Sequence, residues 1–144
     1  MRRLKPLSCV DKDGNGCGLC CRVMRIQELD KPADVWCEHF KKGKGCDIYA
    51  SRPGSCASFK CLWLVSQDKG NKLQSWPISM RPDKSGVIFD MQQVEGKLSL
   101  VLQVDAKRHY KINDPHVIEA AMTIHNKGEI PVYVRYTDKI ARIL

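Results

Sequence analysis

The stretch CGLCC at residues 17–21 decides how this sequence is interpreted, because the other cysteines are arranged around it. The chain contains eight cysteines, and all of them lie within its first 61 residues. The rest of the 144-residue sequence has none. Disulfide pairing alone does not predict so one-sided a distribution, whereas one or two metal centres do.

The spacing within this stretch is typical of a thiolate metal site. Cys17 and Cys20 form a CxxC unit, in which two intervening residues let both sulfurs turn toward one ion. Gly18 predicts a tight backbone between them. Adjacent side chains diverge, so Cys20 and Cys21 are candidates for different ions, or one of them is a spare or redox thiol. We rank the predicted ligands in the order Cys17, Cys20, Cys21 and Cys46, then Cys56 and Cys61, then Cys37 and Cys9.

Composition places the chain among ordinary globular proteins, with 43% hydrophobic and 28% charged residues. No apolar run approaches the roughly 20 residues of a membrane-spanning helix. The basic N-terminus lacks the apolar segment of a secretory signal, which predicts a cytoplasmic protein with no membrane partner. In a reducing cytoplasm, clustered thiols favour metal binding over disulfides.

The formal net charge of +8 predicts a basic surface. Each four-thiolate site holding a dication lowers that charge by two, because ligating thiols are deprotonated. The basic residues are spread along the chain, and the densest group is the lysine-rich loop 41–44 before Cys46. We interpret this loop as a solvated segment, with nucleic acid as the less favoured partner.

Local patterns predict several regular elements. Residues 23–29 form a short element of uncertain type, and residues 9–21 form loops. A helix is expected from about 53 to 66, beginning at Pro53. Residues 86–92 and 97–105 predict a hairpin joined at Glu95-Gly96, because apolar side chains alternate along the second strand. Further expected elements are a helix from Asp114-Pro115 to Gly128, a strand at 130–136, and 140–144 as a candidate continuation.

Together these patterns predict an α+β fold. An irregular cysteine-rich metal-binding half, residues 1–66, packs on a small antiparallel sheet with one or two helices, residues 67–144. A polar link begins at residue 67, and the two halves are expected to form one compact domain.

Five segments together resemble a known family: CGLCC, WCEHF, GKGCDIY, ASRPGSCASF and KCLWL. They are similar to the zinc- or iron-chelating CxxCxxCC family, often called YkgJ-type, over about residues 9–65. The later segment Met80-Arg81-Pro82-Asp83 is also similar. The chain departs from the family pattern at Gly14, where a cysteine is expected three residues before Cys17.

The resemblance implies a bound zinc or iron ion, or an iron–sulfur cluster. The family includes flagellin lysine N-methylases, which are longer proteins. This chain corresponds mostly to their chelating module, so the methylase activity is not carried over. The resemblance also singles out Tyr49, Arg52 and Pro53. From residue chemistry alone, Pro53 is expected to start a helix. Arg52 is expected to pair with a carboxylate or to donate a hydrogen bond to a thiolate sulfur.

The remaining candidates are weaker. Trp36, Phe40, Phe59 and Trp63 are expected to form an apolar wall that excludes water from the sulfurs. His39 is a possible ligand, but a surface or structural role is favoured for it. The sequence has no nucleophile with an adjacent base and no phosphate-cradling loop, so whether the chain is an enzyme stays open.

Three classes of function remain open at this point. The first, which we favour, is a cytoplasmic protein that holds zinc, or an iron centre, through clustered thiolates. The second is an iron–sulfur redox protein or an accessory to a modifying enzyme. The third is a basic, zinc-stabilised interaction module for an unidentified protein or a polyanion.

Overall fold

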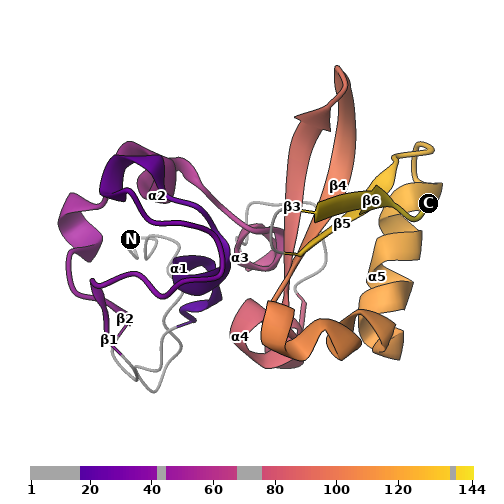
Figure 1. Cartoon of the computed structure of the whole chain (residues 1–144). Helices are drawn as coiled ribbons and strands as arrows, with labels where there is room; N and C mark the ends of the chain where they lie inside the picture. Colours follow the sequence, from indigo (N-terminus) through magenta and orange to yellow (C-terminus); the bar gives the residue numbers. More distant parts are fainter. Residues whose placement is uncertain (1–16, 42–44, 68–75, 137–138) are drawn as a thin grey trace, which may run out of the picture.

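In the computed structural model, the described residues are 17–41, 45–67, 76–136 and 139–144. They form two parts (Figure 1). We call residues 17–67, which consist of short helices and loops, the cysteine part. We call residues 76–144, which form a sheet with helices, the sheet part. The predicted α+β class is confirmed, and Cys9 lies outside the described residues.

The cysteine part is built from short elements. They are α1 (Leu19–Val23), η1 (Gln27–Leu29), β1 (Phe40–Lys41), β2 (Gly45–Cys46), η2 (Tyr49–Ser51), α2 (Gly54–Ser58) and α3 (Leu62–Ser66). Helices of five residues are too short to be stable by themselves in water. Contacts with the rest of the molecule therefore determine where these elements lie.

Three predictions for this part were wrong. The helix expected at 53–66 is two helices, because Phe59 and Cys61 adopt extended backbone angles between α2 and α3. Helix α1 begins inside the predicted loop 9–21, whose first residues lie outside the described ranges. The antiparallel pair β1–β2 lies in a segment expected to be irregular.

The sheet part contains longer elements. They are η3 (Ile78–Met80), α4 (Pro82–Ser85), β3 (Val87–Val94), β4 (Lys97–Val104), η4 (Ala106–Asn113), α5 (Pro115–Asn126), β5 (Val132–Tyr136) and β6 (Lys139–Arg142). The predicted hairpin is confirmed: β3 and β4 pair from Val87↔Val104 to Val94↔Lys97. Glu95 and Gly96 both have positive φ, as a two-residue hairpin turn requires.

The sheet is mixed, so the antiparallel prediction was wrong for one of its three strand pairs. The strand order is β3-β4-β5-β6, and β5 runs parallel to β4 while the other two pairs are antiparallel. After β4 the chain returns through η4 and α5 before it enters β5, and such a crossover makes two strands parallel. Helix α5 begins as predicted, with Asp114 accepting a hydrogen bond from the His116 amide at 2.9 Å.

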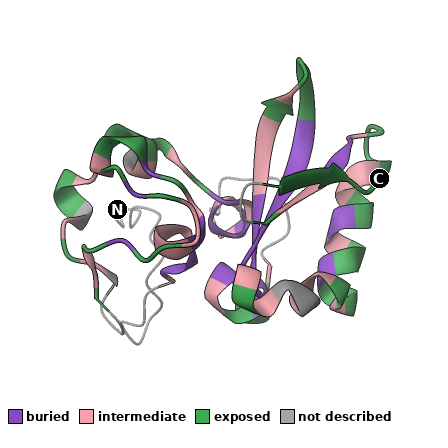
Figure 2. Ribbon diagram, viewed as in Figure 1, coloured by how far each residue is buried: buried purple, intermediate pink, exposed green. Residues whose placement is uncertain are grey.

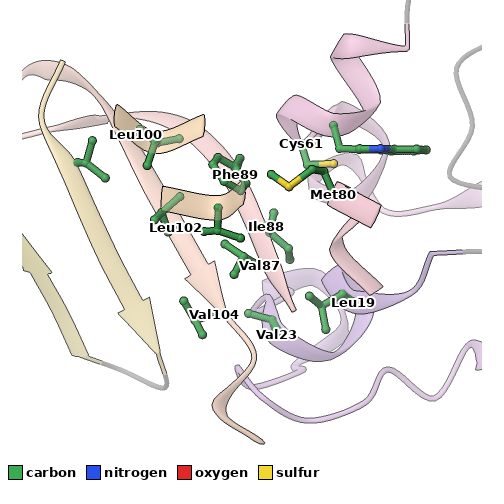
Figure 3. Packing of buried hydrophobic residues seen from close by; sticks show 14 of the residues in the cluster. Leu19, Val23, Cys61, Met80, Val87, Ile88, Phe89, Leu100, Leu102 and Val104 are labelled. Atoms are coloured by element: carbon green, nitrogen blue, oxygen red, sulfur yellow. The ribbon is translucent and has the colours of Figure 1, made fainter. Parts of the chain in front are cut away.

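One hydrophobic core joins the two parts (Figures 2 and 3). Leu19 and Val23 of α1 pack at the end of the hairpin where Val87 pairs with Val104. Cys61 and the first turn of α3 belong to the same cluster. The core therefore holds one side of the cysteine part against the sheet.

Charged groups add a second connection between the parts. Arg22 of α1 lies 3.4 Å from the buried carboxylate of Asp105, which also accepts a hydrogen bond from Arg108 Nε at 3.1 Å. Arg108 Nη1 donates to the Asp83 carbonyl at 3.0 Å, and Asp83 pairs through both oxygens with the buried Arg81. In the portion of the chain that the structure describes, no helix has the length and apolar character needed to span a membrane.

Candidate metal centre

A cavity of about 160 Å³ lies in the cysteine part, and every described cysteine lines it. These residues are Cys17, Cys20, Cys21, Cys37, Cys46, Cys56 and Cys61. They come from the segment before α1, α1 itself, the loop after η1, β2, α2 and the residue before α3. The structure thus gathers around one space the thiols that the sequence distributes over 45 positions.

The thiols are not disulfide-bonded and do not converge on one point. No disulfide involves any of the seven described cysteines. Within the described ranges, no group of three or more His, Cys, Asp or Glu side chains is arranged closely enough to hold a metal ion. The thiols that line the cavity are the donor type that thiophilic metals prefer. Among the described residues, however, they do not lie close enough together for three or more of them to bond to one ion.

The entry to α1 is held by a close contact with an aromatic ring. A Cβ atom added at Gly18 would lie 1.9 Å from a ring carbon of Phe40, which no side chain can accommodate. The φ angle of Gly18 is −123°, so any residue could adopt its backbone conformation. Glycine is therefore required by the packing of Phe40, and the predicted reason, a tight backbone, was wrong.

Backbone hydrogen bonds place the next thiols. The Cys37 amide donates to the Cys21 carbonyl at 2.8 Å, which brings the loop after η1 against α1. The pairing of Phe40 with Cys46 then places β2 at the cavity.

An acidic side chain positions the helix that carries Cys56. Both carboxylate oxygens of Glu28 accept hydrogen bonds from Ser55, at 2.8 Å from its amide and 2.6 Å from its hydroxyl. These bonds lower the pKa of Glu28. Because Ser55 precedes Cys56 in α2, Glu28 fixes the first turn of that helix beside the cavity.

The thiols differ in how readily they ionise. Burial raises the pKa of Cys61 to about 11, although hydrogen bonds from backbone amides at the start of α3 lower it. Burial also raises the pKa values of Cys46 and Cys56. A hydrogen bond with Cys20 lowers the pKa of Cys21, burial opposes it, and the positive charges of Lys31 and Arg52 lower it further.

A buried lysine lies beside the thiols. Lys31 is only 6% exposed. Its Nζ donates to three backbone carbonyl oxygens, at 3.0 Å to Arg22, 2.5 Å to Met24 and 2.8 Å to Pro32. Among the described carboxylates, none forms an ion pair with it. Burial lowers the pKa of Lys31, and the nearby Cys37, Cys21, Asp34 and Cys20 oppose that shift.

Sequence reasoning missed Lys31 and Glu28, whereas the resemblance had singled out Arg52. A lysine before a proline carries no signal of burial. Nothing in the sequence connects Glu28 with Ser55 either, since 27 positions separate them. Arg52 lines the cavity, where its Nη1 donates to the Cys56 carbonyl at 3.3 Å.

The predicted aromatic wall is only partly present. Phe59 lines the cavity, but Trp63 lies in the core shared with the sheet. Trp36 is 48% exposed and stacks on Phe40 at 4.7 Å. Aliphatic side chains complete the lining instead, among them Met24, Ile26, Leu29, Ile48, Leu64 and Ile88.

His39 is not among the residues that line the cavity, and its Nδ1 lies 3.4 Å from Asp47.

No family model, no curated protein and no solved structure matches the chain. The resemblance to the CxxCxxCC family and the predicted roles of its residues stay predictions.

Proposed function

We propose that this protein binds thiophilic metal through the cysteines that line the cavity. The observation that carries the proposal is that seven of the eight cysteines in the sequence border one space. Thiols gathered from α1, β2, α2 and the segments next to them, with no disulfide among the described cysteines, are the ligand type that zinc and iron centres use.

Charge supports a thiolate centre at this place. Negative charge nearby stabilises the buried ammonium group of Lys31, and Cys37 and Cys21 act on it more strongly than the carboxylate of Asp34, with which it forms no ion pair. Thiolates on Cys21 and Cys37 would supply the larger part of that negative charge, with Arg52 as a second cation on Cys21. Four thiolates around a dication carry two net negative charges, which these two cations balance.

The architecture gives the metal a structural task. The elements that carry the cysteines are too short to fold alone, and metal ions organise such segments by converting binding free energy into folding free energy. Bond formation would draw the lining thiols closer together than they now lie. The contribution to folding expected of a structural zinc site is on the order of 10 kcal/mol.

We favour zinc, in the cytoplasm, with an iron centre as the alternative that the sequence resemblance also implies. Zinc suits a structural task because it has no redox chemistry. With an iron–sulfur cluster, the protein would instead act in electron transfer or as an accessory to a modifying enzyme. No residue around the cavity is assigned a catalytic role.

Elemental analysis of protein purified without oxygen, combined with its ultraviolet–visible spectrum, tests the proposal. A colourless protein with stoichiometric zinc supports the structural task. A brown protein with iron, sulfide and absorbance near ~400 nm supports the iron–sulfur alternative. Protein that contains neither metal, and that takes up none from added zinc or ferrous iron under reducing conditions, contradicts the proposal.

A further inference from the structure

The cysteines around the cavity fall into two groups by what they pack against. Cys61 belongs to the hydrophobic core shared with the sheet, and Cys17 and Cys20 pack against that core. The other four described cysteines, namely Cys21, Cys37, Cys46 and Cys56, are not part of that cluster. We call the first set the core-side thiols and the second set the loop-side thiols.

Contacts within each set follow the same division. Cys37 is hydrogen-bonded to Cys21 through its backbone, and both act electrostatically on Cys46 and on Cys56. Cys56 is also influenced by Cys46. Cys61, by contrast, is influenced by Cys17. The electrostatic interactions thus group Cys21, Cys37, Cys46 and Cys56 together and connect Cys61 with Cys17, whereas packing against the core is what places Cys20 in the core-side set.

The two sets meet at neighbouring residues of one helix. Cys20 and Cys21 are consecutive in α1, and a hydrogen bond links their side chains. Consecutive helical residues point about 100° apart, because a helix has about 3.6 residues per turn. One thiol therefore turns toward the sheet while the next turns toward the loops.

We propose that the cavity holds two thiophilic divalent ions, one bound by the four loop-side thiols and one by the three core-side thiols. This inference rests on the proposed metal-binding function and deepens it. Four thiolates complete a tetrahedral shell, as in structural zinc sites, whereas three thiolates leave one coordination position for another ligand. Lys31 and Arg52 lie with the loop-side set, where the larger thiolate charge would be.

Cadmium titration of the reduced, metal-free full chain tests the division. Bound ions are counted by native mass spectrometry, and thiolate-to-cadmium absorbance in the ultraviolet reports the ligands. We expect two ions for the unsubstituted protein. Cys17→Ser leaves two core-side thiols, and Cys46→Ser combined with Cys56→Ser leaves two loop-side thiols, so each of these variants should retain one ion. All three positions are half-buried. The triple variant should retain none.

Two results would overturn the division. Loss of both ions in Cys17→Ser and also in the combined Cys46→Ser and Cys56→Ser variant would show one shared polynuclear site. A single ion in the unsubstituted protein, retained in Cys17→Ser, would show that the core-side thiols bind none. Failure of the unsubstituted protein to bind any ion would instead overturn the proposed function itself. Far-ultraviolet circular dichroism of each variant separates loss of a ligand from loss of the fold, and Cys46→Ser alone, which leaves three loop-side thiols, should retain both ions.

Discussion

The sheet part and the cysteine part are stabilised in different ways. In the sheet part, eight-residue strands and a twelve-residue helix bury side chains such as Val87, Ile88 and Leu100 completely. In the cysteine part, no described helix or strand is longer than five residues, and thiols surround its cavity. Burial of apolar surface is enough to hold the first arrangement together. For the second arrangement, we propose that a metal bound to its sulfurs is needed as well.

The largest effect is expected from Phe89→Ala. Phe89 is 2% exposed and meets Trp76 edge-on at 5.0 Å, so truncation leaves a cavity in the shared core. We expect a loss of about 3–5 kcal/mol in the free energy of unfolding. Chemical denaturation with and without chelator measures it. A loss that appeared only in the metal-loaded protein would contradict this expectation, because the core around Phe89 should be equally stable with and without metal.

A smaller effect, limited to the cysteine part, is expected from Gly18→Ala. The new methyl group overlaps the Phe40 ring, and overpacking of this kind costs about 1–3 kcal/mol. Gly54→Ala is the matched control, because its nearest contact is a Glu28 oxygen at 4.0 Å. Thermal melting of both metal-loaded variants provides the measurement. Equal melting temperatures would contradict the assigned role of Phe40.

Loss of the buried charge should weaken metal binding while leaving the sheet intact. For Lys31→Gln we expect about tenfold or greater loss of zinc affinity, as is usual when a group supporting metal ligands is removed. Lys41→Gln removes a lysine that is 56% exposed, and it should bind zinc as the unsubstituted protein does. Competition with a coloured chelator measures both variants. Unchanged zinc affinity in Lys31→Gln would show that Lys31 does not support metal binding.

The smallest effect concerns pH and the sheet part alone. Burial raises the pKa of Asp90, although hydrogen bonds from Gln103 and Gln92 oppose this shift. A carboxyl group with a raised pKa lowers the free energy of unfolding as pH rises from its ordinary value of 3.8 through the folded value.

Asp90→Asn removes that ionisation, so we expect a modest gain in stability at neutral pH that disappears below about pH 4. Urea denaturation at several pH values, with chelator present, measures the difference. A gain that persists unchanged in acid would assign the effect to something other than this carboxyl group.

Sequence patterns predicted the sheet part better than the cysteine part. The strand at residues 97–105 and the helix start at Asp114-Pro115 were predicted from local signals, and both were confirmed. The parallel pairing of β5 was missed because strand direction depends on the whole crossover. The break between α2 and α3 was missed because a helical stripe through Cys56 and Phe59 looks continuous in sequence.

The candidate site was predictable in its donor type but not in its surroundings. Clustered cysteines indicated thiol chemistry, and the structure places the described ones around one cavity. The supporting groups depend on tertiary contacts. Lys31 reaches backbone carbonyls up to nine residues away, and Glu28 reaches a helix 27 residues later. Contacts over these sequence separations produce no periodic pattern that sequence analysis could detect.

Hydrogen exchange, compared between the metal-loaded and the chelated protein by mass spectrometry, tests the central claim most directly. We expect chelation to remove amide protection from β1, β2 and α2 while β3 and β4 stay protected, because only the former are proposed to depend on bound metal. Unchanged protection of β1, β2 and α2 after complete metal removal, or equal loss over both parts, would contradict it.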